Sequence, residues 1–240
     1  MATLDTRPFH FRQFSLHHHR STMKTGTDAV LLALWVPLEG VGQALDIGTG
    51  SGIISLLLAA RSEQVRVDAV DIDAASAEEA KENFEQSSFS GRLQAFRGDV
   101  SDFAKIADKK YDLIISNPPF FINDRKPEKT GRKLARHTDS LSYVQLLAVA
   151  AKLLKSEGHF AVVLPYREGR GFVTLAENAG LFLRRQMLIF PKPCREPNRV
   201  NLLLGARPVG PVTEKFIIRN EDGFFTRQYL DMVKNYYLSA

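Results

Sequence analysis

Residues 43–61 decide the fold: Gln-Ala-Leu-Asp-Ile-Gly-Thr-Gly-Ser-Gly-Ile-Ile-Ser-Leu-Leu-Leu-Ala-Ala-Arg. The run Gln43–Ile47 predicts a strand, and Ile53–Arg61 predicts a helix that is apolar nearly all round and therefore buried. Gly48, Gly50 and Gly52 lie between them, and glycines let a backbone approach a ligand closely. Ligands of open α/β sheets bind outside the carboxyl ends of the strands, so this stretch predicts a ligand site at the turn.

Strands and helices alternate along the rest of the chain. Further strands are predicted at Val65–Val70, Leu93–Phe96, Tyr111–Ser116, Phe160–Leu164, Met187–Phe190 and Val200–Leu204, and helices at Ala74–Gln86 and about Ser140–Leu154. This alternation is typical of an α/β fold with a mostly parallel sheet and helices on both faces. Too few residues separate the last two strands for a crossover helix, so they should pair antiparallel.

The C-terminal segment Phe225–Leu238 carries apolar and aromatic residues at helical spacing. They are Tyr229, Met232, Val233, Tyr236 and Tyr237. The spacing predicts a helix that packs this stripe against the core.

Length and composition indicate an ordinary globular chain. The 240 residues are 44% hydrophobic and 25% charged, and we expect a single domain over 1–240 with a short N-terminal extension, about 1–38. The apolar stretch Ile53–Ala60 is too short to span a bilayer, and the N-terminus has no signal-peptide pattern. We therefore expect no membrane partner. One cysteine, Cys194, excludes a disulfide framework, so a reducing cytoplasm is expected.

Positive charge is concentrated in three segments, although the net charge is only +5. Residues 124–136 and 184–199 each carry a net +4, and residues 1–24 carry +3. The cations of the first of these segments are Arg125, Lys126, Lys129, Arg132, Lys133 and Arg136. Concentrated cations predict a polyanion partner, although solvated loops with a chance excess of Lys and Arg are the alternative.

Acidic residues stand at the ends of three predicted strands. Asp46 precedes the glycine turn, Asp71 ends the second strand, and Asp99 follows the third. A carboxylate beside a pyrophosphate is repulsive, and Ile53 occupies the place of the third glycine of a dinucleotide fingerprint. A cofactor with a cationic tail, S-adenosylmethionine, fits better. Asp71 can then accept ribose hydroxyls, and Asp99 is placed for an adenine amino group.

The fourth strand end reads Asn117-Pro118-Pro119-Phe120. Proline fixes its own φ and pushes the preceding residue towards extended geometry, so the Asn117 amide oxygen and the Pro118 carbonyl can aim at one spot. Two convergent acceptors suit an exocyclic amino group, and Phe120 could stack on the ring that bears it. Alone, the motif is more often a proline-rich turn; the acidic strand ends upstream favour the functional interpretation.

Together these motifs resemble those of class I S-adenosylmethionine-dependent methyltransferases. The N-terminal Phe9-His-Phe-Arg-Gln-Phe and Met23-Lys-Thr-Gly-Thr-Asp-Ala-Val-Leu-Leu are similar to one branch, the bacterial tRNA(Val) N6-adenine methyltransferases. The resemblance implies a Rossmann-like sheet of seven strands and modification of adenine 37. It also implies site roles: Asp46, Gly48 and Gly50 on the methionine and ribose side of the cofactor, Asp71 on the ribose, Asp99 on the adenine, Asn117 at the cofactor as well, Asn117–Phe120 in catalysis, and Thr27 closing the pocket.

Other interpretations stay open at this point. Asn-Pro-Pro-aromatic also occurs in enzymes that methylate guanine N2 of ribosomal RNA or a protein glutamine amide. An NAD-dependent oxidoreductase or a catalytically silent RNA-binding module is disfavoured. His17-His18-His19 invites a metal site, but adjacent residues rarely point at one centre, so no metal is expected and solvated loop residues or weak phosphate contacts fit better.

Overall fold

The computed structural model describes residues 7–21, 26–119 and 141–238. An eight-stranded sheet of order β10-β8-β9-β7-β6-β3-β4-β5 runs through them. Its strands are β3 (Gln43–Ile47), β4 (Arg66–Asp71), β5 (Leu93–Arg97), β6 (Tyr111–Ser116), β7 (Leu154–Pro165), β8 (Phe182–Phe190), β9 (Arg199–Gly205) and β10 (Val212–Ile217). A separate hairpin pairs β1 (Phe9–His10) with β2 (Ser15–Leu16).

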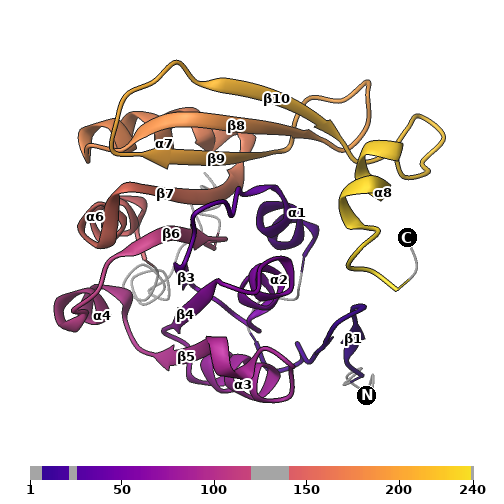
Figure 1. Cartoon of the computed structure of the whole chain (residues 1–240). Helices are drawn as coiled ribbons and strands as arrows, with labels where there is room; N and C mark the ends of the chain where they lie inside the picture. Colours follow the sequence, from indigo (N-terminus) through magenta and orange to yellow (C-terminus); the bar gives the residue numbers. More distant parts are fainter. Residues whose placement is uncertain (1–6, 22–25, 120–140, 239–240) are drawn as a thin grey trace, which may run out of the picture.

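Helices cover both faces of this sheet, as predicted (Figure 1). One face packs against α1 (Thr27–Trp35), α2 (Ile53–Arg61), α3 (Ala74–Glu85) and α8 (Arg227–Val233), and the other against α4 (Val100–Ile106), α6 (Tyr143–Leu153) and α7 (Tyr166–Asn178). Two hydrophobic clusters, one on each face, form the core. Within the described ranges, no helix has the length and apolar character needed to cross a membrane.

The strand order reverses between β3 and β6. The chain runs from β3 to β4 and β5 on one side, and from β6 to β7 on the other. β3 and β6 are parallel neighbours, with Ile47 opposite Ser116 at their carboxyl ends. Ligands of open α/β sheets bind at such a reversal. The fold therefore places the site at Gly48 and Asn117, which directly follow β3 and β6.

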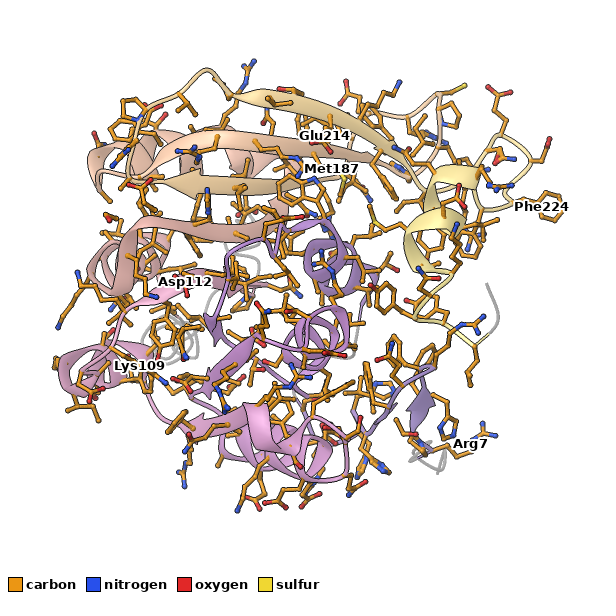
Figure 2. All side chains as sticks on the ribbon, viewed as in Figure 1. Arg7, Lys109, Asp112, Met187, Glu214 and Phe224 are labelled. Atoms are coloured by element: carbon orange, nitrogen blue, oxygen red, sulfur yellow. The ribbon has the colours of Figure 1, made fainter. Side chains whose placement is uncertain are left out.

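The C-terminal half of the sheet is mixed. β9 pairs antiparallel with β7 and β8, which confirms the predicted antiparallel strand. The sheet has eight strands and not the expected seven, because β10 adds a parallel edge strand beside β8. Glu214 of β10 lies opposite Met187 of β8 (Figure 2), and its carboxylate pairs with Arg185 and accepts a hydrogen bond from Trp35.

The C-terminal helix is shorter than the predicted Phe225–Leu238. α8 begins after Thr226, whose hydroxyl accepts a hydrogen bond from the Tyr229 amide, and ends at Val233. Tyr237 lies beyond the helix and forms an antiparallel bridge with Phe11 of the N-terminal segment. The aromatic stripe nevertheless packs on the core as predicted, with Tyr229 and Val233 buried.

Candidate functional site

A cavity of about 510 Å³ opens over the carboxyl ends of β3, β4, β5 and β6. Its lining includes Gly48, Gly50, Asp71, Asp99, Asn117, Pro118 and Pro119 among the residues predicted from sequence. Of the predicted residues that the structure describes, two are not in the lining: Asp46, and Thr27, which is exposed in the first turn of α1. The neighbours of Thr27, Gly26 and Ala29, do line the cavity.

The glycine turn owes its shape to left-handed backbone conformations. Gly48 has φ +71° and Gly50 has φ +57°, in the region where a side chain is strained. The amides of Gly48 and Thr49 both donate to the Val70 carbonyl oxygen of β4, at 2.8 and 3.3 Å. The turn is therefore folded back over the next strand, with its backbone exposed to the cavity.

Asp46 is fully buried beneath this turn. Its Oδ2 accepts hydrogen bonds from the hydroxyls of Thr49 and Ser55, both at 2.7 Å, and its Oδ1 is buried without a hydrogen-bond partner among the described residues. Burial raises the pKa of Asp46 to about 6, against the lowering effect of the two hydroxyls. Asp46 thus braces the turn from below.

Asp71 ends β4 and faces the cavity directly. Its Oδ2 accepts from the Gly50 amide at 2.8 Å, and its Oδ1 accepts from the Asp73 amide at 2.9 Å. Burial raises its pKa, while these amides oppose the shift. A carboxylate has about four acceptor positions, so each oxygen retains capacity for a ligand hydroxyl.

Asp99 lies on the same wall, at the N-terminus of α4. It is exposed, and its Oδ1 accepts from the Ser101 amide at 2.6 Å as a helix cap. Ile72, 57% exposed, and the buried Val100 flank the acidic pair in the lining. Apolar side chains beside two carboxylates can hold a flat heterocycle while the acids accept from its polar edge.

The fourth strand end offers an acceptor. Asn117 lines the cavity, and its Oδ1 is buried without a hydrogen-bond partner among the described residues. Pro118 is buried and Pro119 is exposed, and Ser116 fixes the strand end by donating to the Ile47 carbonyl oxygen at 2.8 Å. Since a buried acceptor without a donor is costly, Asn117 Oδ1 is suited to an N–H from a ligand.

Some predicted site residues lie outside the described residues. They are Phe120 and the cations Arg125, Lys126, Lys129, Arg132, Lys133 and Arg136. Some residues of the cavity lining are not among those predicted from sequence; they include Ile72, Val100, Leu141 and Gln145. For Ile72 and Val100 a signal existed, since each directly follows a strand-end Asp; for Leu141 and Gln145 only the fold reveals that the start of α6 closes the cavity.

The three histidines lie along the N-terminal segment that crosses α3. The amides of His17 and His19 donate to the Asn83 and Glu79 side chains, so this stretch is held mainly by its backbone. In the portions of the chain that the structure describes, no group of three or more His, Cys, Asp or Glu residues could hold a metal ion.

The charge around the cavity fits a cationic cofactor. Asp71, Asp73 and Asp99 line it and Asp46 lies beneath, whereas the described lining includes no Lys or Arg. A polyphosphate would be repelled by this wall, but a ligand with ammonium and sulfonium groups would be attracted. Among the described residues, the lining also offers Asn117 Oδ1 as a buried acceptor without a hydrogen-bond partner. The residues present therefore fit S-adenosylmethionine.

Comparison with known proteins agrees with this chemistry. The family model described as a methyltransferase small domain matches residues 18–169. A tRNA1(Val) (adenine(37)-N6)-methyltransferase from Trichodesmium erythraeum is 40% identical over 96% of this chain and 97% of its own length. A protein of the same name from Enterobacter sp. is 39% identical over 99% of this chain and 97% of its own.

Solved structures share the fold. A predicted O-methyltransferase from Agrobacterium tumefaciens superposes with a TM-score of 0.67, at 20% identity, over 87% of this chain and 96% of that one. The CcbJ methyltransferase from Streptomyces caelestis gives a TM-score of 0.54 at 13% identity, over 75% of this chain and 90% of its own. At these identities the likeness establishes the architecture of the fold.

Proposed function

Because the chain belongs to the methyltransferase small-domain family, we propose that it methylates the N6 amino group of an adenine in tRNA, adenine 37 of a valine tRNA. The observation that carries this proposal is the buried Asn117 Oδ1 at the cavity, which has no hydrogen-bond partner among the described residues. The relatives named tRNA1(Val) (adenine(37)-N6)-methyltransferase, which match this chain over nearly its full length, support it. As tRNA is the substrate, we expect the reaction to take place in the cytoplasm.

S-adenosylmethionine supplies an electrophilic methyl group to this site. We assign its methionine and ribose side to the Gly48–Ser51 turn with Asp46 beneath it, its ribose hydroxyls to Asp71, and its adenine to Asp99 with Ile72 and Val100. Thr27 stays a predicted pocket-closing residue.

Asn117 performs the activating role at the substrate amine. The lone pair of an adenine N6 is delocalised into the ring, so the amine is a poor nucleophile. Hydrogen bonds from its two N–H groups to Asn117 Oδ1 and the Pro118 carbonyl oxygen localise density on nitrogen, orient it, and stabilise the positive charge that develops there. No general base is required, since the proton becomes acidic once the nitrogen is alkylated.

The substrate adenine must leave its stack to reach Asn117. Extrusion costs a few kcal/mol, and least for a base that is already unpaired. We assign Phe120 to stacking on the inserted base, a contact worth about 1–3 kcal/mol. We assign the basic residues that follow the motif to phosphates around that base. They are Arg125, Lys126, Lys129, Arg132, Lys133 and Arg136.

Cations at the same edge of the sheet, of which Arg167, Arg170 and Arg195 are exposed and Lys192 is half-buried, also support an RNA substrate. β7 and β8 run in the same direction as β6, because both are antiparallel to β9 and β7 is parallel to β6. The segments after their carboxyl ends carry Arg167, Arg170, Lys192 and Arg195, with Glu168 and Glu196 among them. These positive residues therefore lie at the same edge of the sheet as Asn117, where phosphates of a bound tRNA would pass.

The test is nucleoside mass spectrometry of an unmodified valine tRNA after incubation with the protein and S-adenosylmethionine. We expect N6-methyladenosine, and its loss when adenine 37 is replaced by guanine in the transcript. Ribosomal RNA and a purified release factor serve as competing substrates. Methylation of guanine N2 or of a glutamine amide, with none on tRNA, would overturn the proposal.

A further inference from the structure

The segment Ser15–Ser21, here called the N-terminal strap, lies across α3. Glu79 of α3 holds it: Oε1 accepts the amides of His19 and Arg20 at 3.0 Å each, and Oε2 accepts the Ser21 amide at 2.9 Å. The Glu79 side chain is fully buried. Burial alone would raise its pKa, but the backbone amides outweigh burial and lower the pKa of Glu79. The strap is thus fixed by a carboxylate that stays ionised.

Asn83, one helical turn further along α3, binds the strap and the glycine turn together. Its Oδ1 accepts the His17 amide at 2.9 Å, and its Nδ2 donates to the carbonyl oxygens of His17 and Ser51, both at 2.8 Å. Asn83 is 1% exposed, and Ser51 lines the cavity. One buried amide group therefore bridges an N-terminal segment and the wall of the cofactor site.

The same face of α3 supports the turn by direct packing. A Cβ at Gly52 would lie 2.5 Å from Cε1 of Phe84 and 3.4 Å from the Ala80 methyl group. Residues 79, 80, 83 and 84 occupy one face of the helix because they are spaced by about one turn. The turn consequently sits on α3 and cannot move without disturbing this face.

The first described residues after the strap also lie at the cavity. The described chain resumes at Gly26, which lines the cavity together with Ala29. The N-terminal segment thus reaches the cofactor site through Asn83 to Ser51, and Gly26 of the cavity wall follows Ser21 by five positions in the sequence.

We propose that Asn83 is a positioning residue that couples docking of the N-terminal strap to the shape of the cofactor-binding turn. The inference deepens the proposed function, because it rests on S-adenosylmethionine binding at that turn. It assigns the conformation of Ser51 to Asn83 and gives the strap a role in cofactor affinity by way of Asn83.

The first experiment compares Asn83→Ala and Asn83→Asp with the full-length wild type. The probe is S-adenosylhomocysteine, titrated by calorimetry without tRNA. Loss of the bond to Ser51 should weaken binding roughly tenfold in both variants, since a net hydrogen bond contributes about 0.5–1.5 kcal/mol and 1.4 kcal/mol is tenfold. The KM for cofactor should rise in parallel, while the KM for tRNA and kcat at saturating cofactor change less than about twofold.

Asn201→Ala is the matched control. Asn201 is fully buried in β9, but neither atom of its amide has a hydrogen-bond partner among the described residues, and it does not line the cavity. Its removal should leave cofactor affinity unchanged. An unchanged affinity in a folded Asn83→Ala protein, or an equal loss in Asn201→Ala, overturns the proposal.

Glu79→Gln tests the coupling without altering any group that contacts Ser51. The glutamine replaces one carboxylate oxygen by an NH2 group, which then faces either the Ser21 amide or the His19 and Arg20 amides, donor against donor. Hydrogen exchange of the His19–Ser21 amides should therefore accelerate, and cofactor affinity should fall by about threefold, less than in Asn83→Ala. Faster strap exchange with wild-type affinity overturns the coupling. If tRNA is the wrong substrate, no protein in the series will methylate it, yet these calorimetric differences will remain.

Discussion

The ends of β3 and β6 lie side by side, and each carries a buried side-chain oxygen without a hydrogen-bond partner among the described residues, yet the two differ in their surroundings. At β3, the other oxygen of Asp46 is taken by Thr49 and Ser55, so the side chain braces the turn. At β6, Asn117 faces the cavity beside two prolines, and its Oδ1 has no hydrogen-bond partner among the described residues. One strand end is committed to the protein, and the other is open to a ligand.

Asn117→Ala gives the largest expected effect. Removal of the acceptor should lower kcat for tRNA methylation by roughly a hundred- to a thousandfold, the range found when one group that stabilises developing charge is deleted. Affinity for S-adenosylhomocysteine should remain within about twofold, because the cofactor is assigned to other strand ends. Single-turnover methylation with calorimetry checks both. If kcat persists, or if affinity collapses instead, the division between the two strand ends is wrong.

Asp46→Asn tests the other strand end through pH. The folded pKa of Asp46 is raised from 3.8 to about 6, so its contribution to stability is fully present below pH 3.8 and is lost as pH rises through 6. Asparagine carries no charge to bury. The variant should therefore be more stable than wild type at pH 8 by up to about 3 kcal/mol, a margin that shrinks below pH 6 and vanishes near pH 4.

Urea denaturation of both proteins at pH 8 and pH 4 measures this margin. Because the other carboxylates are the same in both proteins, their pH-dependent contributions to stability cancel when the two unfolding free energies are subtracted. The kcat of Asp46→Asn should fall far less than that of Asn117→Ala. A margin independent of pH would show that folding does not raise the pKa of Asp46.

Gly52→Ala compared with Gly48→Ala separates strain from contact at the β3 turn. Both glycines have positive φ, +85° and +71°, so each alanine should cost about 1–2 kcal/mol of unfolding free energy. Only at Gly52 does the new methyl group collide with the Phe84 ring, which should add about 1–3 kcal/mol. Equal losses in denaturation midpoints would mean that the turn does not rest on α3. Gly52→Ala with Phe84→Leu should recover part of the additional cost.

The sequence predicted those parts of the fold whose local signals agree with their burial. β3, α2 and β6 have the predicted limits, because each is an apolar run bounded by glycines, polar residues or prolines. β10 was missed, since Val212–Ile217 is an edge strand with only Phe216 buried and shows little apolar pattern. α7 was missed as well; its two glycines, Gly169 and Gly171, disfavour a helix locally, and packing of Phe172 and Ala176 overrides them.

The site divides in the same way. Strand-end acids and the Asn-Pro-Pro motif are local features, so the sequence predicted that Asp71, Asp99 and Asn117 would meet, and all three line one cavity. Sequence reasoning assigned Asp46 to the cofactor surface, but it lies beneath the turn, because the side-chain alternation of β3 directs it away from the cavity lining. The bridge from Asn83 to Ser51 joins positions 32 residues apart, and no local pattern announces such a contact.

Neutralising the basic residues that follow Asn117 should give the smallest effect of the series. It should change tRNA affinity alone, whereas changes at the β3 end act on the turn that is assigned to the cofactor. Arg132→Ala with Lys133→Ala removes two cations assigned to tRNA phosphates, so tRNA affinity should fall about tenfold at moderate salt, and the slope of log affinity against log salt should drop by about two. Cofactor affinity should stay at the wild-type value, because the cavity lining in the described chain contains no cation. Filter binding over a salt series, beside calorimetry with S-adenosylhomocysteine, measures both.

A Lys81→Ala variant, which removes an exposed cation of α3 that lies outside the cavity lining, controls for net charge. An unaltered salt slope in the double variant would move the tRNA contact from the β6 end to the cations after β7 and β8.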